Sequence, residues 1–326
     1  SESNYELALY YHWIGDLKIA DSLYKKSLLI FRNNKNVTKR ILASTLNDYA
    51  VLKYDIAEYK ESEKMHTESL NILLESFGEK DRDVASLYNN LANVMQQKND
   101  IDGAEKYFNK ALQLNIELFG ENRPEVSSNY NNLAYIYVDK GDFTKAEEYF
   151  KKSLELKSKY YGAEHSFVGF GLVNLGGLEF RMNKINKSEE YILDAIKNLK
   201  ISVNENHIWL GLADYWYGKI LIEKNKYLEA ETYLRKSLKI NKNNYPEDHP
   251  NIISTSAELG VVSFYLNRFT EAENLLIYGY EGVKKIKGYK DHNTIRFLEY
   301  LIKLYEKTQN VTKLTYYNQL LLQAKK

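Results

Sequence analysis

Hydrophobic and small positions recur with a fixed period of 42 residues along the whole chain. One column holds a small residue in seven of its eight members, which are Ala20, Ser62, Ala104, Ala146, Ser188, Ala230, Ala272 and Leu314. A second column, starting at Leu7, is Leu or Tyr throughout, and the next, starting at Ala8, is Ala or Gly until Ile302. Such self-similarity marks stacked supersecondary units, so the sequence predicts a solenoid of eight units without insertions.

Within one unit the apolar spacing is helical. In the fourth unit apolar and small residues stand at Tyr130, Leu133, Ala134 and Tyr137, and then at Phe143, Ala146, Tyr149, Phe150, Ser153 and Leu154. Spacings of three and four residues predict two amphipathic helices, through 130–137 and 143–154. Small residues such as Ala92 and Ala104 are expected where the two helices cross closely, because larger side chains would push the axes apart.

Turn residues separate the predicted helices. The column between the two helices of a unit reads Gly15, Ala57, Asn99, Gly141, Asn183, Asn225, Asn267 and Gln309, mostly residues that tolerate the left-handed conformation ending a helix. A second column of this kind follows the second helix, as at Gly78 and Gly120. We therefore expect one all-α domain over 1–326, with units at about 1–36, 37–78, 79–120, 121–162, 163–204, 205–246, 247–288 and 289–326.

Composition and charge exclude several classes of protein. Hydrophobic residues make up 44% and charged residues 27%, which is typical of a folded chain. The longest apolar stretch, 166–178, is too short to span a bilayer, so we expect no membrane insertion. A net charge of +1 gives no global field to attract a polyanion, so no nucleic-acid partner is expected. With no signal peptide in the sequence, we expect a cytoplasmic location.

The columns resemble a known family. Leu, Ala and Tyr on the first helix, followed by Ala, Phe and Ser on the second, resemble the tetratricopeptide repeat, as at Leu133, Ala134, Tyr137, Ala146, Phe150 and Ser153. The 42-residue period and the motif YNNLA at 88–92 and 130–134 resemble the long-repeat subclass of kinesin light chains and bacterial signalling proteins. The resemblance implies a right-handed superhelical solenoid whose first helices line a concave groove.

The sequence offers little for catalysis or metal binding. His165, His207 and His249 recur at the 42-residue spacing, but successive units lie about 10 Å apart, whereas zinc ligands lie about 2 Å from one ion. The chain has no phosphate-binding loop, dinucleotide fingerprint or nucleophile elbow, and no cysteine. We therefore expect no catalytic residue, no metal and no cofactor.

Asparagines are the main candidates for partner binding. By the resemblance, the groove columns of units two to five contribute Asn47, Asn89, Asn90, Asn93, Asn131, Asn132 and Asn174. An amide donates and accepts at once, which suits the alternating N–H and C=O groups of an extended peptide. The alternative is that these asparagines are tolerated on an exposed helix surface or hydrogen-bond within the repeats.

Aromatic residues replace the asparagines in the fifth and sixth units. Phe170, Phe180, Tyr215 and Trp216 occupy the groove columns there, and Gly177 leaves an unfilled space among them. This arrangement predicts either an apolar socket for an anchor side chain of the partner or tight packing between neighbouring units.

These features predict a scaffold that binds a protein or peptide partner in its groove, in an oligomeric state that the sequence does not define. The alternative is a regulatory or sensor arm of a larger bacterial protein, such as a kinase or a caspase-like protease, whose effector domain lies outside this sequence. The chain begins without methionine, and we expect it to be a fragment. An RNA-binding helical repeat would need a basic groove, which these columns lack.

Overall fold

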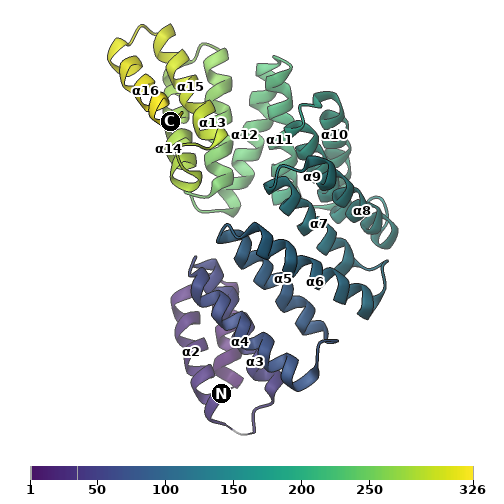
Figure 1. Ribbon diagram of the computed structural model, residues 1–326. Helices are drawn as coiled ribbons and strands as arrows, with labels where there is room; N and C mark the ends of the chain where they lie inside the picture. The colour runs from purple at the N-terminus through teal and green to yellow at the C-terminus, as the bar shows by residue number, and fades with distance from the viewer. Residues whose placement is uncertain (1, 35, 326) are drawn as a thin grey trace. The chain divides into compact units, whose positions relative to one another are not determined.

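The computed structural model describes residues 2–34 and 36–325, which divide into two compact units, 1–160 and 161–326. The helices of the first unit are α1 (Glu2–Trp13), α2 (Leu17–Asn33), α3 (Lys39–Asp55), α4 (Tyr59–Phe77), α5 (Arg82–Gln97), α6 (Ile101–Phe119), α7 (Pro124–Asp139) and α8 (Phe143–Tyr161) (Figure 1). Those of the second unit are α9 (Ser166–Arg181), α10 (Ile185–Ser202), α11 (Ile208–Glu223), α12 (Tyr227–Asn244), α13 (Pro250–Tyr265), α14 (Phe269–Lys287), α15 (His292–Lys307) and α16 (Val311–Ala324).

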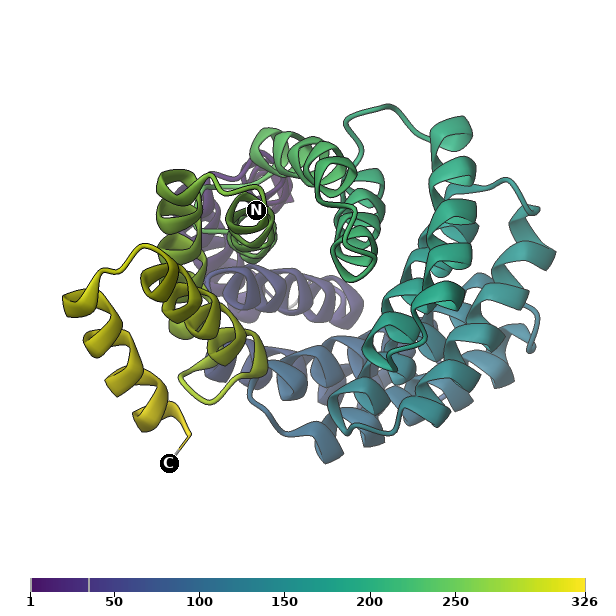
Figure 2. The ribbon, with the colours of Figure 1, turned by 90° about the horizontal axis from the view of Figure 1, so that it is seen from above.

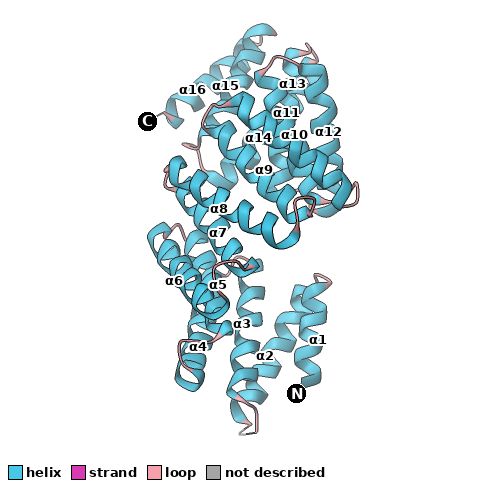
Figure 3. Ribbon diagram, turned by 90° about the vertical axis from the view of Figure 1, so that its right-hand side faces the viewer, coloured by secondary structure: helices cyan, strands magenta, loops and turns pink. Residues whose placement is uncertain are grey.

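Consecutive helices pair into eight helix-turn-helix hairpins, which we number from the N-terminus. The described part of the chain contains helices and loops and no strand (Figure 3). Seen from above, the hairpins of the second unit follow one another in chain order from teal through green to yellow (Figure 2). The structure thus confirms the predicted all-α architecture of about eight repeated units. None of the described helices combines the length and the apolar character needed to cross a bilayer.

Left-handed residues end the first helix of each hairpin, as the sequence predicts. All eight members of the Gly15 column have positive φ, from 55° at Gln309 to 84° at Gly15. The second turn column is less uniform. Gly78, Gly120 and Gly288 follow their helices with positive φ, whereas α10 and α12 end in the extended residues Val203 and Tyr245. The residue types at the turns therefore account for the turn within every hairpin, but for only some of the turns between hairpins.

The two helices of a hairpin cross at the columns of Ala8 and Ala20. Two serine hydroxyls in the Ala20 column donate hydrogen bonds directly to backbone carbonyls in the Ala8 column. Ser62 Oγ lies 2.8 Å from Ala50 O, and Ser188 Oγ lies 2.7 Å from Gly176 O. A side chain of one helix can reach the backbone of the other only where the axes approach closely, so only small residues fit at this crossing.

The crossing is packed in two ways. In the first and third hairpins an alanine of the Ala8 column shares a buried cluster with an aromatic residue of the second helix, Ala8 with Tyr24 and Ala92 with Phe108. In hairpins five to seven a glycine faces a branched aliphatic residue, and a Cβ on Gly218 would lie 2.5 Å from Leu234 Cγ. A flat ring leaves room for a methyl group, whereas a branched side chain fills that space itself.

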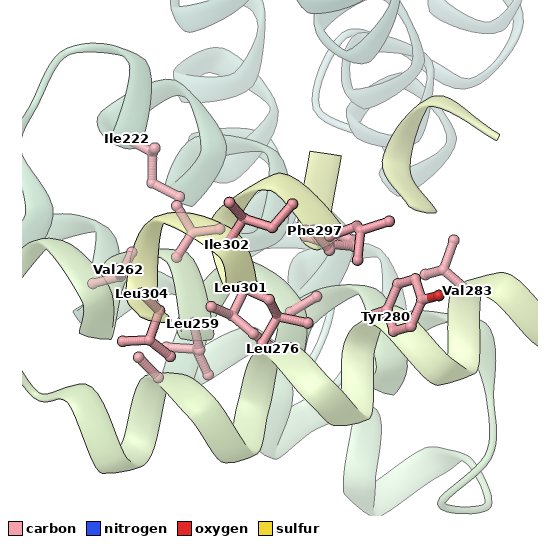
Figure 4. Packing of buried hydrophobic residues seen from close by; sticks show 14 of the residues in the cluster. Ile222, Leu259, Val262, Leu276, Tyr280, Val283, Phe297, Leu301, Ile302 and Leu304 are labelled. Atoms are coloured by element: carbon pink, nitrogen blue, oxygen red, sulfur yellow. The ribbon is translucent and has the colours of Figure 1, made fainter. Parts of the chain in front are cut away.

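The core lies between hairpins as well as within them. In the second unit Leu259 of α13, Leu276 of α14 and Leu301 of α15 converge in one buried cluster (Figure 4). In the first unit a comparable cluster joins Ala43 of α3 and Leu70 of α4 to residues of α5 and α6. Each hairpin is therefore stabilised by its neighbours as well as by its own packing, as in other linear repeat arrays.

Ion pairs join neighbouring hairpins at a repeated place. An acidic column near the start of six second helices meets a cation of the next hairpin, as in Asp21–Lys53 at 2.8 Å, Glu105–Lys140 at 2.6 Å and Glu231–Arg268 at 2.6 Å. Glu63–Lys98, Glu189–Lys224 and Glu273–Lys313 belong to the same series. Exposed pairs of this kind contribute about 0.2–1 kcal/mol each, so they support the stacking without dominating it.

One histidine is buried in the first unit. His66 of α4 stands in the column otherwise occupied by Tyr24, Phe108 and Phe150, and it is 1% exposed. Its Nδ1 has no hydrogen-bond partner among the described residues. Burial lowers the pKa of His66 to about 4 because desolvation disfavours the charged imidazolium.

Overpacking the helix crossing should destabilise the first unit. Ala134 is fully buried at the crossing of α7 and α8, so Ala134→Leu is expected to lower the free energy of unfolding by about 1–3 kcal/mol. Chemical denaturation measures this loss. The matched control is Thr144→Leu, which adds the same side chain at an exposed position of α8 and should change stability by less than about 0.5 kcal/mol. Equal effects of the two changes would contradict the assigned crossing.

His66 should make stability depend on pH. The unfolded chain protonates His66 below about pH 6.5, whereas the folded protein keeps it neutral down to about pH 4. The folded state therefore loses stability as the pH falls through this window, by up to about 3 kcal/mol. Replacement by the phenylalanine of the neighbouring hairpins should remove this loss, so the stability advantage of His66→Phe should be about 2 kcal/mol larger at pH 5 than at pH 7. An advantage that does not change with pH in denaturation experiments would refute the assignment, and His292→Phe, at an exposed position, is the control.

Candidate functional site

The predicted binding residues all lie on first helices. Within each unit these helices also contact one another directly, α1 with α3 and α3 with α5 in the first unit, and α9 with α11, α11 with α13 and α13 with α15 in the second. Their shared surface is called here the inner face of each unit. The asparagines from Asn47 to Asn132 lie on the first helices α3, α5 and α7 of the first unit, and Asn174, Phe170, Phe180, Tyr215 and Trp216 lie on first helices of the second.

Some inner-face asparagines connect neighbouring hairpins. Asn90 Nδ2 donates to Asn47 Oδ1 at 2.8 Å, and Asn47 Nδ2 donates to Asp48 Oδ1 at 3.1 Å. Tyr5 makes the equivalent contact one hairpin earlier, where its hydroxyl lies 2.5 Å from Asp48 Oδ2. Both inter-hairpin pairs are 43 residues apart, which is one repeat plus one residue. These polar side chains therefore bind the repeats to each other.

Asn89 belongs to a second, more deeply buried amide chain. Asn115 Nδ2 donates to Asn129 Oδ1 at 2.7 Å, and Asn129 Nδ2 donates to Asn89 Oδ1 at 2.9 Å. Asn89 Nδ2 in turn lies 3.2 Å from the carbonyl oxygen of Ala85. Hydrogen bonding within the repeats, one of the two explanations that the sequence allows, therefore accounts for Asn47, Asn89 and Asn90.

Two asparagines of the first unit keep their side-chain amides available. Asn93 of α5 and Asn132 of α7 are half-buried, and in the described part of the chain neither amide group has a hydrogen-bond partner. Asn131 and Asn174 do make interactions within the chain. The structure thus divides the asparagine set, and Asn93 and Asn132 are its members that remain free to bind a ligand.

The space beside Gly177 is filled by Trp216. A Cβ on Gly177 would lie 2.8 Å from Trp216 Cε2 and 3.0 Å from Trp216 Cζ2. The Trp216 ring also packs against Phe180, with ring centroids 5.6 Å apart, while Phe170 stacks on Trp209 at 4.9 Å. Of the two explanations for this glycine, packing between α9 and α11 therefore accounts for the space, and no empty socket remains there.

Charged residues that the sequence analysis did not select lie next to these rings. Glu258 of α13 is 1% exposed and accepts two hydrogen bonds from Arg296 of α15, at 2.6 and 3.0 Å. Lys219 of α11 lies 3.6 Å from the same carboxylate. The ammonium group of Lys219 also lies over the rings of Phe180, Tyr215 and Trp216, at 4.8, 5.7 and 5.2 Å from their centroids.

Burial and the neighbouring charges affect the pKa values of Glu258 and Lys219 differently. Burial alone would raise the pKa of Glu258, but Arg296 and Lys219 hold it below its ordinary value, so the carboxylate is ionised. The pKa of Lys219 is instead lowered, because its desolvation outweighs the attraction of Glu258. The sequence analysis did not select this pair. Its signal in the sequence is the spacing of 39 residues between Lys219 and Glu258, which is also the spacing that brings Gly177 and Trp216 together.

The recurring histidines cap helices. The Nδ1 atoms of His165, His207 and His249 each accept a hydrogen bond from the backbone N–H two residues later, at 3.2 Å, at the starts of α9, α11 and α13. His249 also stacks on Tyr245, with centroids 3.8 Å apart. A hollow of about 470 Å³ beside His165 is lined by loop residues 161–166 and Ser202. Across the described residues no group of His, Cys, Asp and Glu has the geometry of a metal site.

Comparison with protein families identifies one family, the tetratricopeptide repeat, through two models. A family model described as tetratricopeptide repeat matches residues 1–75, 83–156 and 125–201, and a second model with the same description matches 215–244. No curated protein gives a significant match to the sequence.

Solved structures with the same fold have low sequence identity. The apo form of the quorum sensor NprR from B. thuringiensis has a TM-score of 0.71 and 14% identity, covering 99% of this chain and 87% of that one. The apo form of RapI has a TM-score of 0.64 and 15% identity, covering 87% and 97%. A signal transduction ATPase with a tetratricopeptide repeat sensor from Pyrococcus horikoshii has a TM-score of 0.64 and 17% identity, covering 87% and 42%.

The two kinds of asparagine should differ in their effect on stability. Asn90→Ala removes the bond to Asn47 and is expected to lower the free energy of unfolding by about 0.5–1.5 kcal/mol. Asn132→Ala, one repeat later in the same column, removes no bond within the described chain and should change stability by less than about 0.5 kcal/mol. Denaturation of the two variants tests this difference, and a greater loss in the second would show that the bonding pattern is wrong.

Proposed function

Because this chain belongs to the tetratricopeptide repeat family, whose repeats indicate a protein-interaction or sensor role, we propose that it binds an extended segment of a partner protein. The proposed contacts are made by the inner faces of its first helices. Hairpins of this kind serve typically as non-catalytic scaffolds. The proposal places the asparagines of the first unit against the peptide backbone and the aromatic residues of the second against partner side chains.

The observation that carries the proposal is the pair of unused amides on α5 and α7. Asn93 and Asn132 are 39 residues apart, the spacing that brings Lys219 to Glu258 and Gly177 to Trp216 in the second unit. The repeat geometry therefore supports their facing each other across neighbouring hairpins. A half-buried amide without a partner has given up part of its hydration without compensation, and a peptide N–H or C=O group would restore the lost hydrogen bonds.

A second candidate function is a sensor or regulatory arm of a larger bacterial signalling or effector protein, such as a kinase or a caspase-like protease. It is favoured by the structural likeness over 99% of this chain to a protein described as a quorum sensor. The two functions share the inner face as the binding surface. They differ in whether binding changes the activity of a further domain.

The amide pair is tested by a double substitution. Affinity capture with the full chain supplies partners, and their affinities for the parent and for Asn93→Ala/Asn132→Ala are then compared by calorimetry. Loss of two backbone-directed hydrogen bonds should weaken binding by about tenfold or more. Thermal stability should hardly change, because neither side chain is bonded within the described residues.

The control is a pair on the second helix of the fourth hairpin. Glu148 and Lys152 of α8 are exposed and bonded mainly to each other, at 2.7 Å, so Glu148→Ala/Lys152→Ala should leave affinity unchanged. If the control variant binds the partner more weakly than the parent while the asparagine variant binds it as tightly, the binding site lies on the opposite surface.

A further inference from the structure

One side of α1 is called here its outer face and is defined by Leu7, Tyr10, Tyr11 and Ile14. Leu7 and Tyr10 are 43% and 53% exposed, and Ile14 is exposed as well. Within the first unit α1 packs on α2 and α3 and lies at one end of the helices of that unit (Figure 3). The outer face is therefore an apolar surface that no helix of its own unit covers.

The equivalent residues of later hairpins form the interface with the preceding hairpin. Leu133 and Ile136 of α7, which are the equivalents of Leu7 and Tyr10, share a buried cluster with Phe108 of α6. The equivalents of Tyr10 in all seven later hairpins are at most 2% exposed. The outer face of α1 thus continues an interface that is formed repeatedly within the chain.

Tyr11 adds a polar group to this face. Its hydroxyl has no hydrogen-bond partner in the described part of the chain. Its equivalent Tyr137 donates to Glu105 Oε1 of the preceding second helix at 2.6 Å. A second equivalent, Tyr305, donates to Glu273 Oε1 at 2.8 Å. Both pairs are 32 residues apart, so a helix packed on α1 in the same way would offer its carboxylate to Tyr11.

The corresponding surface of the last helix is polar instead. Seven second helices have an acid in the column of Asp21 and, three residues later, a buried aromatic, aliphatic or histidine side chain in the column of Tyr24. In α16 these two columns hold Thr315 and Asn318, which are both exposed. A polar outer surface of this kind is typical of the terminal repeat of an array. The outer face of α1 has kept its apolar residues.

The packing of α6 on α7 indicates which kind of helix fits the outer face. Glu105, Phe108 and Leu112 lie at positions one, four and eight of a single stripe on α6, and they supply the acid for Tyr137 and the apolar contacts. A second copy of the chain that stacked head to tail would offer α16, which lacks both the acid and the first apolar residue. The chemistry of the face therefore favours a helix of another protein.

We propose that the outer face of α1 is a docking surface for an amphipathic helix of a partner protein, in which an acidic residue is followed by apolar residues three and seven positions later. This helix packs on α1 as α6 packs on α7. Its acidic side chain accepts a hydrogen bond from Tyr11, and its apolar residues cover Leu7 and Tyr10. The surface is separate from the inner face, so the proposal goes beyond the proposed function.

The experiment uses the full chain and a synthetic peptide with the sequence of residues 101–119, which is that of α6. A lactam bridge between Asp102 and Lys106, which are both exposed in α6, keeps the peptide helical, because a free helix of this length is only marginally stable in water. Calorimetry should show saturable binding. Hydrogen exchange of the backbone amides should slow in α1 and stay unchanged in α16 when the peptide binds.

Variants of the chain locate the contact. Tyr10→Asp introduces a charge in the middle of the outer face and should weaken binding of the peptide at least tenfold. The matched control is Leu29→Asp, which introduces the same charge at a 66% exposed leucine of α2 in the same hairpin and should leave the affinity unchanged. Both positions are exposed, so both variants should fold.

Variants of the peptide test the proposed stripe. Phe108→Asn gives the peptide the residue that α16 has in this column and should weaken binding at least tenfold. Glu105→Ala in the peptide and Tyr11→Phe in the chain each remove one partner of the same hydrogen bond and should weaken binding about fivefold. Together they should weaken it little more than either change alone, which a double-mutant cycle measures.

Several results would overturn the docking surface. These are failure of the peptide to bind the full chain, binding that Tyr10→Asp leaves unchanged, and equal losses in Tyr10→Asp and Leu29→Asp. Sedimentation of the chain alone tests the competing occupant, since self-association that Tyr10→Asp abolishes would show that a second copy covers the face. Asn93→Ala/Asn132→Ala should bind the peptide as tightly as the parent, so failure of this proposal leaves the inner-face proposal intact.

Discussion

The close crossing of the two helices in each hairpin is the constraint on which the rest of the structure depends. The hydroxyls of Ser62 and Ser188 reach backbone carbonyls of the opposite helix, so there is space for a small side chain and for little else. The chain meets this constraint with an alanine beside a ring in the first and third hairpins, and with a glycine against a branched aliphatic residue in hairpins five to seven. Both solutions fill the space at the crossing, so the two helices can stay close together while the sequence varies.

Because the hairpin geometry is constant, residues at a fixed spacing in the sequence meet across neighbouring hairpins. Residues 43 apart meet as Tyr5 with Asp48 and as Asn47 with Asn90, and residues 39 apart meet as Lys219 with Glu258. Polar side chains on the inner faces therefore fall into two groups. Some form hydrogen bonds or ion pairs with a neighbouring repeat, and others form no such bond. The side chains that are left over are the chemically informative ones, because burial without a partner is costly and a ligand can relieve that cost.

The inner faces of the two units differ in chemistry. The first unit presents amides, which match a peptide backbone of any sequence. The second has a lysine and an arginine around a single buried glutamate, and aromatic rings lie beside the lysine.

The sequence by itself determined the repeat, the helix pairs and the first turn of every hairpin, because small residues, apolar spacing and left-handed turn residues act over a few positions. It also led us to expect a binding surface on the first helices. Only the tertiary structure decided that Asn90 bonds Asn47, that Trp216 fills the space beside Gly177, and that Lys219 lacks a close carboxylate. Those facts depend on which side chains meet across neighbouring hairpins. The type of a residue limits the hydrogen bonds and ion pairs that its side chain can form. The packing against the neighbouring hairpin decides which of these are already formed within the chain.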